Sequence, residues 1–446
     1  MPRYADRSLA EKGFRLSLIL LLFSLAAFSK VGPAVGQREE FRGEEGLELP
    51  LIEDVDERIR RREEEERERK PVKSKKKYPY DVIDAETTYR YGYDDNVFRS
   101  SSIPVPGDPK VLRHQGSEYQ EGWFDFEFDR YYSLGTKLSI DYFYKGEFFE
   151  EFRSKERQRN TLRLQWQERL DKGEYLRAGI RESRRLATAH NRFGEKLKTD
   201  IDYYRTDLYL EYEFDLNDID EIELEYRFVN YDYDEYPGDL SDDWHENRIS
   251  IDWDRELTQD TTLNFFARNK WRSYREEYAR RGVDGERIPG TLRRQGNLEF
   301  GVGIEKVFRP GFEVDLEVSY EDLADDYQDY YSYGGLNFRF DLEYPITEKL
   351  RFEADGRIYK RDFDNRRFLA SRQPNPFPPP SRLDPFIELY EDYLVRLGLF
   401  YEYSDKLELG LGWRHRWYRV SDPTEAFREN RVFFQVRYYF KKVSSL

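Results

Sequence analysis

The chain has 446 residues, of which 37% are charged, and a formal net charge of −16 at pH 7. So many charged side chains exclude a bundle of apolar membrane-spanning helices, but they allow a β-barrel, in which only every second strand residue meets lipid. The negative balance argues against a nucleic-acid partner, and the lack of cysteine argues against disulfides, thiolate metal sites and a cysteine-linked lipid anchor.

The N-terminus predicts a secretion signal over residues 1–36. Basic residues from Arg3 to Arg15 precede an apolar run over 16–28. This run has about 13 residues and is therefore too short to cross a bilayer, which needs roughly 20. Small residues at 34–36 fit a cleavage site, so the mature chain is expected to begin at Gln37, with an uncleaved signal anchor as the alternative.

Residues 37–77 form a charged segment that is expected on the periplasmic side. Glu63 and Arg67, like Glu65 and Arg69, are spaced to form ion pairs along a helix, and Pro71 ends any such helix. A solvated helix or linker is one interpretation, and a partner-binding coiled coil is the other. The lysines over 73–77 are expected to contact anionic lipid head groups.

A period of two residues dominates the rest of the chain, over 78–446. In the first repeat, over 83–93, the odd positions are mainly apolar or aromatic and the even positions up to Arg90 are mainly charged; the repeat over 312–320 shows the same alternation. The alternation persists for about 9–13 residues per segment, which suits a tilted strand that crosses an outer membrane. Strands of a soluble sandwich, the alternative, run about 5–6 residues. The 36 tyrosines and 32 phenylalanines gather at segment ends, where aromatic rings favour the lipid–water boundary.

Turn residues divide this region into hairpins with two kinds of connection. Short turns are predicted at 133–136, 171–174, 215–220, 258–260, 309–311, 345–349 and 404–406. Longer loops are predicted at 94–120, 148–160, 183–201, 230–246, 275–295, 321–334, 361–388 and 419–430. The predicted fold is therefore all-β, a transmembrane antiparallel up-and-down β-barrel of about 16 strands, with 14–18 possible if a hairpin slips.

The residues on the inward face are expected to determine which solutes the barrel passes, because about sixteen strands enclose more space than side chains fill. Its predicted lining comprises a basic patch (Arg163, Arg169, Arg177, Arg181, Arg205) and an acidic patch (Glu299, Glu305, Glu313, Asp315, Glu317, Asp341, Glu343). On roughly opposite walls these patches would set up a field across the lumen that favours hydrated solutes. The alternative is that the charges solvate the lumen and pair with their neighbours.

The sequence favours no enzyme chemistry, no metal site and no cofactor. Among the four histidines, His114, His190 and His245 fall in predicted loops and His415 on the lipid-facing register. Ser241 shares a loop with His245, but no nucleophile motif or metal-ligand spacing accompanies them. Acidic loop segments such as 94–96 and 325–329 offer oxygen ligands for calcium without the spacing of a known calcium loop.

One short string carries a family resemblance. Residues 91–99 read Tyr-Gly-Tyr-Asp-Asp-Asn-Val-Phe-Arg at the end of the first predicted strand. This string resembles the outer-membrane β-barrel porins that are associated with exopolysaccharide export. The resemblance implies a channel, and in its specialised form one that releases an acidic polysaccharide.

The leading hypothesis is an outer-membrane channel for polar or charged solutes, with polysaccharide export as a special case. A non-conducting structural or receptor barrel is the second hypothesis, and a lipid-modifying barrel enzyme the third. The expected partners are outer-membrane lipid or lipopolysaccharide, a transported solute, and the barrel assembly machinery. That machinery is expected to read the aromatic-ended last strand, from Phe434 to Phe440.

Overall fold

The computed structural model describes residues 78–97, 115–152, 156–190, 196–200, 202–233, 243–280, 287–308, 311–327, 329–367, 387–420 and 426–445. The predicted signal and charged segment over 1–77 lie outside these ranges, as do His114, Ser241 and most of the loop at 361–388. No helix within the described ranges is long and apolar enough to cross a membrane.

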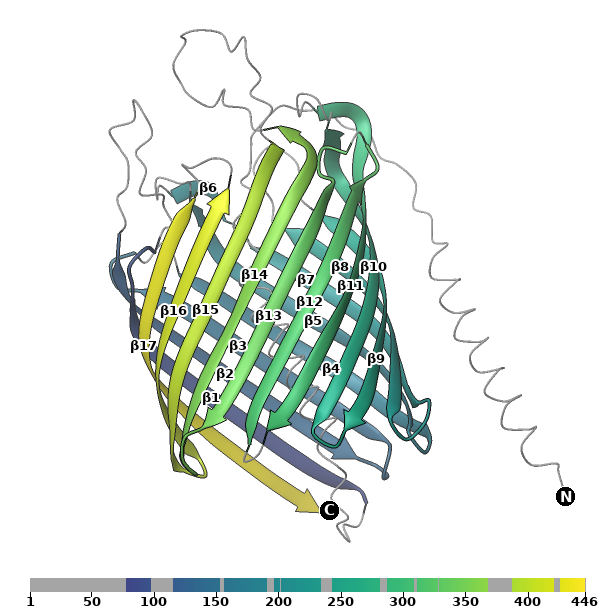
Figure 1. Ribbon diagram of the computed structural model, residues 1–446, viewed down its shortest axis with the longest axis vertical. Coiled ribbons are helices and arrows are strands. Elements are labelled where there is room, and N and C mark those ends of the chain that lie inside the picture. Colours follow the sequence, from purple (N-terminus) through teal and green to yellow (C-terminus); the bar gives the residue numbers. More distant parts are fainter. Residues whose placement is uncertain are drawn as a thin grey trace, which may run out of the picture.

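The described residues form one antiparallel sheet that closes on itself (Figure 1). Its strands are β1 (Tyr80–Asp94), β2 (Ser117–Tyr131), β3 (Lys137–Phe149), β4 (Arg157–Asp171), β5 (Glu174–His190), β6 (Lys196–Asp200), β7 (Tyr203–Asp215), β8 (Asp220–Tyr233), β9 (Trp244–Thr258), β10 (Thr261–Arg280), β11 (Arg287–Phe308), β12 (Phe312–Asp325), β13 (Tyr333–Pro345), β14 (Leu350–Arg367), β15 (Ile387–Ser404), β16 (Leu407–Val420) and β17 (Phe427–Ser445).

Closure occurs where the first strand meets the last. β1 pairs with β2 on one side and with β17 on the other, from Tyr80 opposite Ser445 to Asp94 opposite Arg431. The short strand β6 pairs only with the end of β5, while β5 also pairs with β7. The barrel wall therefore has sixteen strands, as the sequence predicts, and β6 is an addition to one of its loops.

The predicted turns and loops fall at opposite ends of the barrel. All seven short turns connect strands at the end where the C-terminus lies, the lower end in Figure 1, and we call it the short-turn end. Gly173, between β4 and β5, has φ of +71°, which explains why a glycine occupies that turn. The longer connections lie at the other end, which we call the long-loop end.

Several predicted loops are shorter in the structure than the sequence indicates. β10 and β11 continue to Arg280 and from Arg287, so most of the loop predicted at 275–295 is strand. β5 likewise continues to His190 within the loop predicted at 183–201. The sequence pattern fails here because these strand extensions carry charged residues: Arg293 on β11 pairs with Glu277 on β10 at 2.8 Å.

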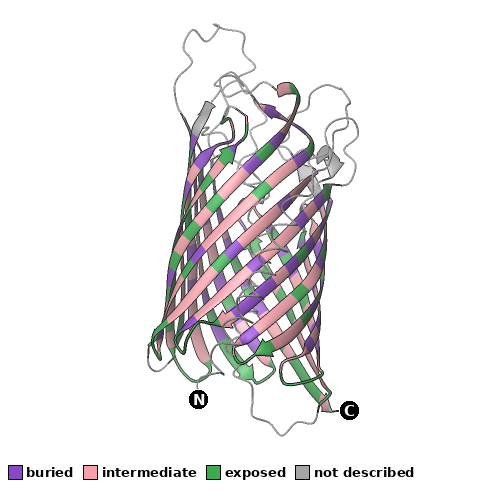
Figure 2. Cartoon of the chain, turned by 90° about the vertical axis from the view of Figure 1, so that its right-hand side faces the viewer, coloured by how far each residue is buried: buried purple, intermediate pink, exposed green. Residues whose placement is uncertain are grey.

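The two faces of the wall differ in chemistry, as β4 illustrates. Leu162, Leu164 and Trp166 are 49%, 44% and 42% exposed, whereas Arg163 and Gln165 between them are 6% and 7% exposed. Figure 2 shows this alternation of exposure along the strands. The apolar residues therefore cover the outside of the barrel, and the polar residues face its lumen.

Aromatic side chains add small cores to the lumen face near the long-loop end. The largest joins Tyr333, Phe363, Tyr390, Tyr418 and Phe427, contributed by β13 to β17. Arginines lie against these rings, as Arg361 does 5.0 Å from the ring centre of Tyr390. Such contacts stabilise these parts of the wall.

Candidate functional site

The candidate site is the lumen-facing wall, whose charged side chains come from every part of the ring. Strand register places all twelve residues predicted to line the pore on this face, and most of them alternate with apolar residues outside. Which of them meet a passing solute depends on their surroundings, so their contacts are considered in turn.

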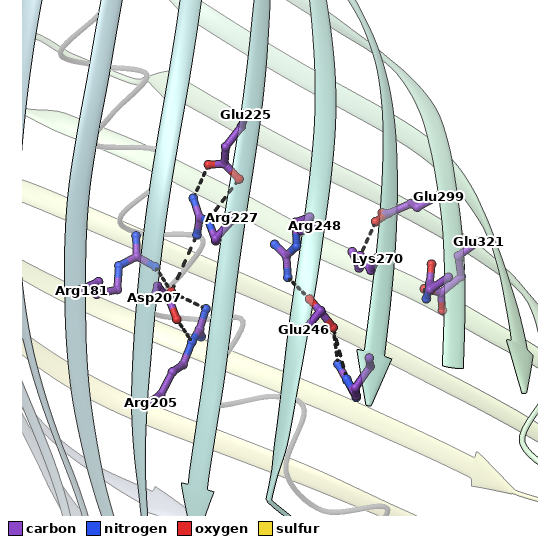
Figure 3. Close-up of polar contacts among 12 residues, drawn as sticks. Arg181, Arg205, Asp207, Glu225, Arg227, Glu246, Arg248, Lys270, Glu299 and Glu321 are labelled. Carbon is purple, nitrogen blue, oxygen red and sulfur yellow. Dashed lines mark hydrogen bonds and ion pairs between the residues drawn. The ribbon is translucent and has the colours of Figure 1, made fainter. Parts of the chain in front are cut away.

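Asp207 on β7 is the centre of a buried ion-pair cluster (Figure 3). Its carboxylate lies 2.7 Å from Nε of Arg205, 3.5 Å from Nη1 of Arg181 and 4.0 Å from Nη1 of Arg227. Asp207 is 0% exposed, so its charge needs the surrounding guanidinium groups. Arg227 also pairs with Glu225, so the cluster joins three arginines to two carboxylates.

The network of ion pairs continues around the wall from β9 to β11. Glu246 accepts hydrogen bonds from Arg248 at 3.1 Å and from Arg272 at 2.9 Å. The carboxylate of Glu299 lies 3.0 Å from Nζ of Lys270. The contacts of Glu246 with Arg272 and of Glu299 with Lys270 join neighbouring strands through their side chains (Figure 3).

Most of the predicted basic patch also has acidic partners. Arg163 lies 2.5 Å from Asp141 on β3, and Arg177 forms ion pairs with Glu211 and Glu213 on β7, the latter at 2.6 Å. Arg169 lies beside the short turn, where its Nε donates to the carbonyl of Asp171. On this part of the wall the contacts match the alternative interpretation of the sequence, in which the lumen charges pair with their neighbours. The partner acids Asp141, Asp207 and Glu211 were missed by the sequence reasoning, although they follow the same period of two.

The predicted acidic patch is more continuous than the basic one. Directly opposed positions on β11 to β14 carry Glu305, Asp315, Asp341 and Asp355 in one row, and Glu313, Glu343 and Glu353 in the next. Cations lie at its borders: Arg339 is 3.9 Å from Glu317, Arg351 is 3.9 Å from Glu343, and Arg396 is 2.5 Å from Asp355. Opposed like charges on neighbouring strands repel, and the bordering cations, including Arg351 at 2.7 Å from Glu353, offset part of this negative charge near the short-turn end.

A group of carboxylates on β7 and β8 has the geometry of a metal site. The ligand oxygens of Glu211, Glu213 and Glu223 lie within 4.8 Å of one another. Arg177 forms ion pairs with two of the three, so the positive charge that a metal ion would supply is already present. The arrangement acts as an ion-pair cluster of the wall.

Two histidines face away from the lumen. His245 on β9 lies on the outer face with its ring 6.3 Å from that of Phe228. His415 on β16 is also on the outer face, as predicted, and its Nδ1 is 2.8 Å from Oδ1 of Asn430. Ser273 on β10 is directly opposite His245, but among the described residues no hydrogen bond joins the two side chains, and the partner considered for His245 from the sequence, Ser241, lies outside the described ranges.

Comparisons with known proteins give only distant structural likeness. No family model and no curated protein matches the chain. Among solved structures, OccAB1 of Acinetobacter baumannii has 10% identity and a TM-score of 0.44, and the match covers 83% of this chain and 100% of that one. A BenF-like porin from Pseudomonas fluorescens Pf-5 has 10% identity and a TM-score of 0.46, over 81% and 99% of the two chains. An anion-selective porin from Comamonas acidovorans has 8% identity and a TM-score of 0.42, over 80% and 99%.

Proposed function

We propose that this barrel spans a bacterial outer membrane and forms a channel for small polar or charged solutes. The observation that carries the proposal is the opposite chemistry of the two faces of each strand, apolar outside and charged inside. A soluble barrel has no need of an apolar outer surface, and a barrel without a watery lumen has no need of a charged inner one.

The outer surface has the composition expected next to lipid. On β11, Leu298, Phe300 and Val302 are 47%, 51% and 39% exposed. The outer residues of β4 are exposed to a similar extent. Exposed aromatic residues mark both borders of this apolar band, with Tyr93 at the long-loop end and Tyr403 at the short-turn end. Rings of this kind settle at the lipid–water boundary, which supports a membrane-spanning orientation with the short turns on the periplasmic side.

The lumen surface is suited to water and hydrated solutes. Sixteen strands enclose a volume larger than their own side chains fill. The ion pairs around Asp207 and Glu246 fix charged groups on the wall, and the acidic patch on β11 to β14 adds an uneven charge. A polar solute exchanges its hydrogen bonds with water for those with such a wall at little cost, whereas an apolar solute gains nothing from it.

Polysaccharide export is a narrower form of the same proposal. Its support is the resemblance carried by the string at 91–99, and three residues of that string have a structural explanation. Asp94 pairs with Arg431, Asp95 accepts hydrogen bonds from the backbone and side chain of Asn430, and Asn96 donates to the carbonyl of Arg428. These contacts join β1 to β17 and do not by themselves define a solute, so we propose the general channel first.

Solute uptake into proteoliposomes tests the general proposal. Vesicles that contain the refolded protein are placed in isotonic solutions of sugars of increasing size, and their swelling rate is measured. Swelling with small sugars that declines with sugar size is the expected result. Folded protein that gives no more swelling than empty vesicles would refute an open channel, and entry of an acidic oligosaccharide would favour the export form.

A further inference from the structure

A group of cationic and aromatic side chains lies on the outer face of the neighbouring strands β14 to β17, near the long-loop end (Figure 1). Strand register sets Tyr393 on β15, Trp417 on β16 and Arg428 on β17 side by side. Arg419 lies two residues farther along β16, towards the long loops. The sequence predicted a loop over 419–430, but β16 and β17 extend into that range, which places both arginines on strands.

These side chains lie at the long-loop border of the apolar outer band. Leu411 on β16 and Val432 on β17 are 58% and 56% exposed, and they point to the same side as Trp417 and Arg428. From Leu411 towards the long loops, the outward positions change from apolar to aromatic and then to cationic. This is the order expected where a membrane meets water, because aromatic rings and the long side chain of arginine settle at the level of the lipid head groups.

One ring holds both guanidinium groups. The guanidinium of Arg419 lies 5.3 Å from the ring centre of Trp417, and that of Arg428 lies 5.2 Å from it. Trp417 in turn stacks on Tyr393, with ring centres 5.3 Å apart. Contact with the face of a ring leaves the N–H groups at the edge of a guanidinium able to donate in its own plane. The rings therefore fix the position of the arginines and preserve their capacity to bind an anion.

A carboxylate fixes one side of Arg419. Glu391 on β15 lies 3.1 Å from Nη1 of Arg419, and its side chain is 12% exposed, whereas that of Arg419 is 51% exposed. Lys360 on β14 is directly opposite Glu391; its side chain is 45% exposed and lies 3.6 Å from Asp362. These acids reduce the local charge. The part of each cation that remains accessible is its outward edge, which faces the surroundings of the barrel.

We propose that Arg419 and Arg428 bind a phosphate group of lipopolysaccharide, the glycolipid of the outer leaflet. The inference rests on the proposed orientation of the barrel, with its short turns on the periplasmic side. Guanidinium groups present paired N–H donors that match two phosphate oxygens, and both groups lie beside the same ring, within reach of one head group. The acyl chains of that lipid then lie along the apolar band, against Leu411 and Val432.

Native mass spectrometry of the refolded protein in neutral detergent micelles tests the site without requiring conduction. The probes are lipid A with two phosphate groups, the same lipid with both phosphates removed, and inorganic phosphate. We expect the phosphorylated lipid to bind at least about tenfold more tightly than the dephosphorylated one, and the double variant Arg419→Gln with Arg428→Gln to lose this preference. Inorganic phosphate that binds as tightly as the lipid would overturn a lipid site.

Arg255→Gln is the matched control. Arg255 is on the outer face of β9 at the short-turn end, its side chain is 42% exposed, and it lies 3.8 Å from Asp220. The control is expected to keep the wild-type preference for the phosphorylated lipid. An equal loss in the control and the double variant would show unspecific attraction and overturn the site, as would a double variant with unchanged preference. If the double variant does not fold, Arg428→Gln alone is used under the same criterion.

Conductance measured on the same samples separates the two proposals. Selective lipid binding by folded protein that conducts no ions would support the site and overturn the channel. Conductance without a preference for the phosphorylated lipid would overturn the site and support the channel.

Discussion

Substitution of Arg431 by glutamine tests how the barrel is closed. The guanidinium of Arg431 on β17 lies 2.8 Å from Asp94 on β1, 2.8 Å from Glu429 and 2.5 Å from Glu147 on β3. Asp94 and Glu429 are both 0% exposed. Glutamine keeps a polar end but carries no charge. The variant therefore leaves buried carboxylates with less positive charge around them at the seam, where β1 pairs with β17.

The expected loss follows from the cost of removing one partner of a buried ion pair, which is about 3–5 kcal/mol. Arg414 also contacts Glu429 and remains in the variant, which keeps the loss within this range although three carboxylates are affected. We therefore expect the free energy of unfolding to fall by about 4 kcal/mol. Adding Asp94→Asn to the variant removes one of the uncompensated charges and should restore part of the loss.

Urea unfolding in lipid vesicles, followed by the fluorescence of the tryptophans, measures this change. Arg339→Gln is the control: its side chain is 30% exposed and its contact with Glu317 is 3.9 Å long. A loss below about 1 kcal/mol is expected there. Equal losses for the two variants would refute the conclusion that Arg431 holds the seam together.

Three further outcomes are expected. Val302→Arg on the outer face should destabilise the barrel in lipid by about 2–4 kcal/mol. Asn264→Arg on the lumen face, beside Asp254, should be tolerated. Equal losses of stability in the two variants would contradict the assignment of the faces. Gly173→Ala should cost about 1–2 kcal/mol in urea unfolding because it forces a side chain into positive φ. Neutralising the acidic patch with Glu313→Gln and Asp341→Asn should lower the ratio of cation to anion permeability; an unchanged reversal potential would place these groups away from the ion path.

The sequence was sufficient to predict the strands and their faces because, in the membrane-spanning barrel that we propose, lipid imposes a strict rule. A residue such as Leu164 on the outer face must be apolar, while its neighbour Arg163 is free to be polar, so a period of two marks each strand. The short turns were predictable for a similar reason, since Gly173 and other turn residues interrupt that period.

The ends of the strands and the partners of the charges were harder to predict. Beyond the apolar band of the outer face the strands carry polar residues on both faces, so the segments around Arg157 and Arg185 had the composition of loops. Contacts between distant strands depend on register: Arg431 and Asp94 are 337 residues apart and meet only because the ring closes.

Single-channel recording in a planar bilayer tests the central claim most directly. The refolded mature protein is added to one side, and current is measured in symmetric salt and then in a salt gradient. Steady conductance steps with a reversal potential that shifts when the acidic patch is neutralised are the predicted result. Folded, membrane-inserted protein that carries no current under any voltage or salt condition would contradict a channel.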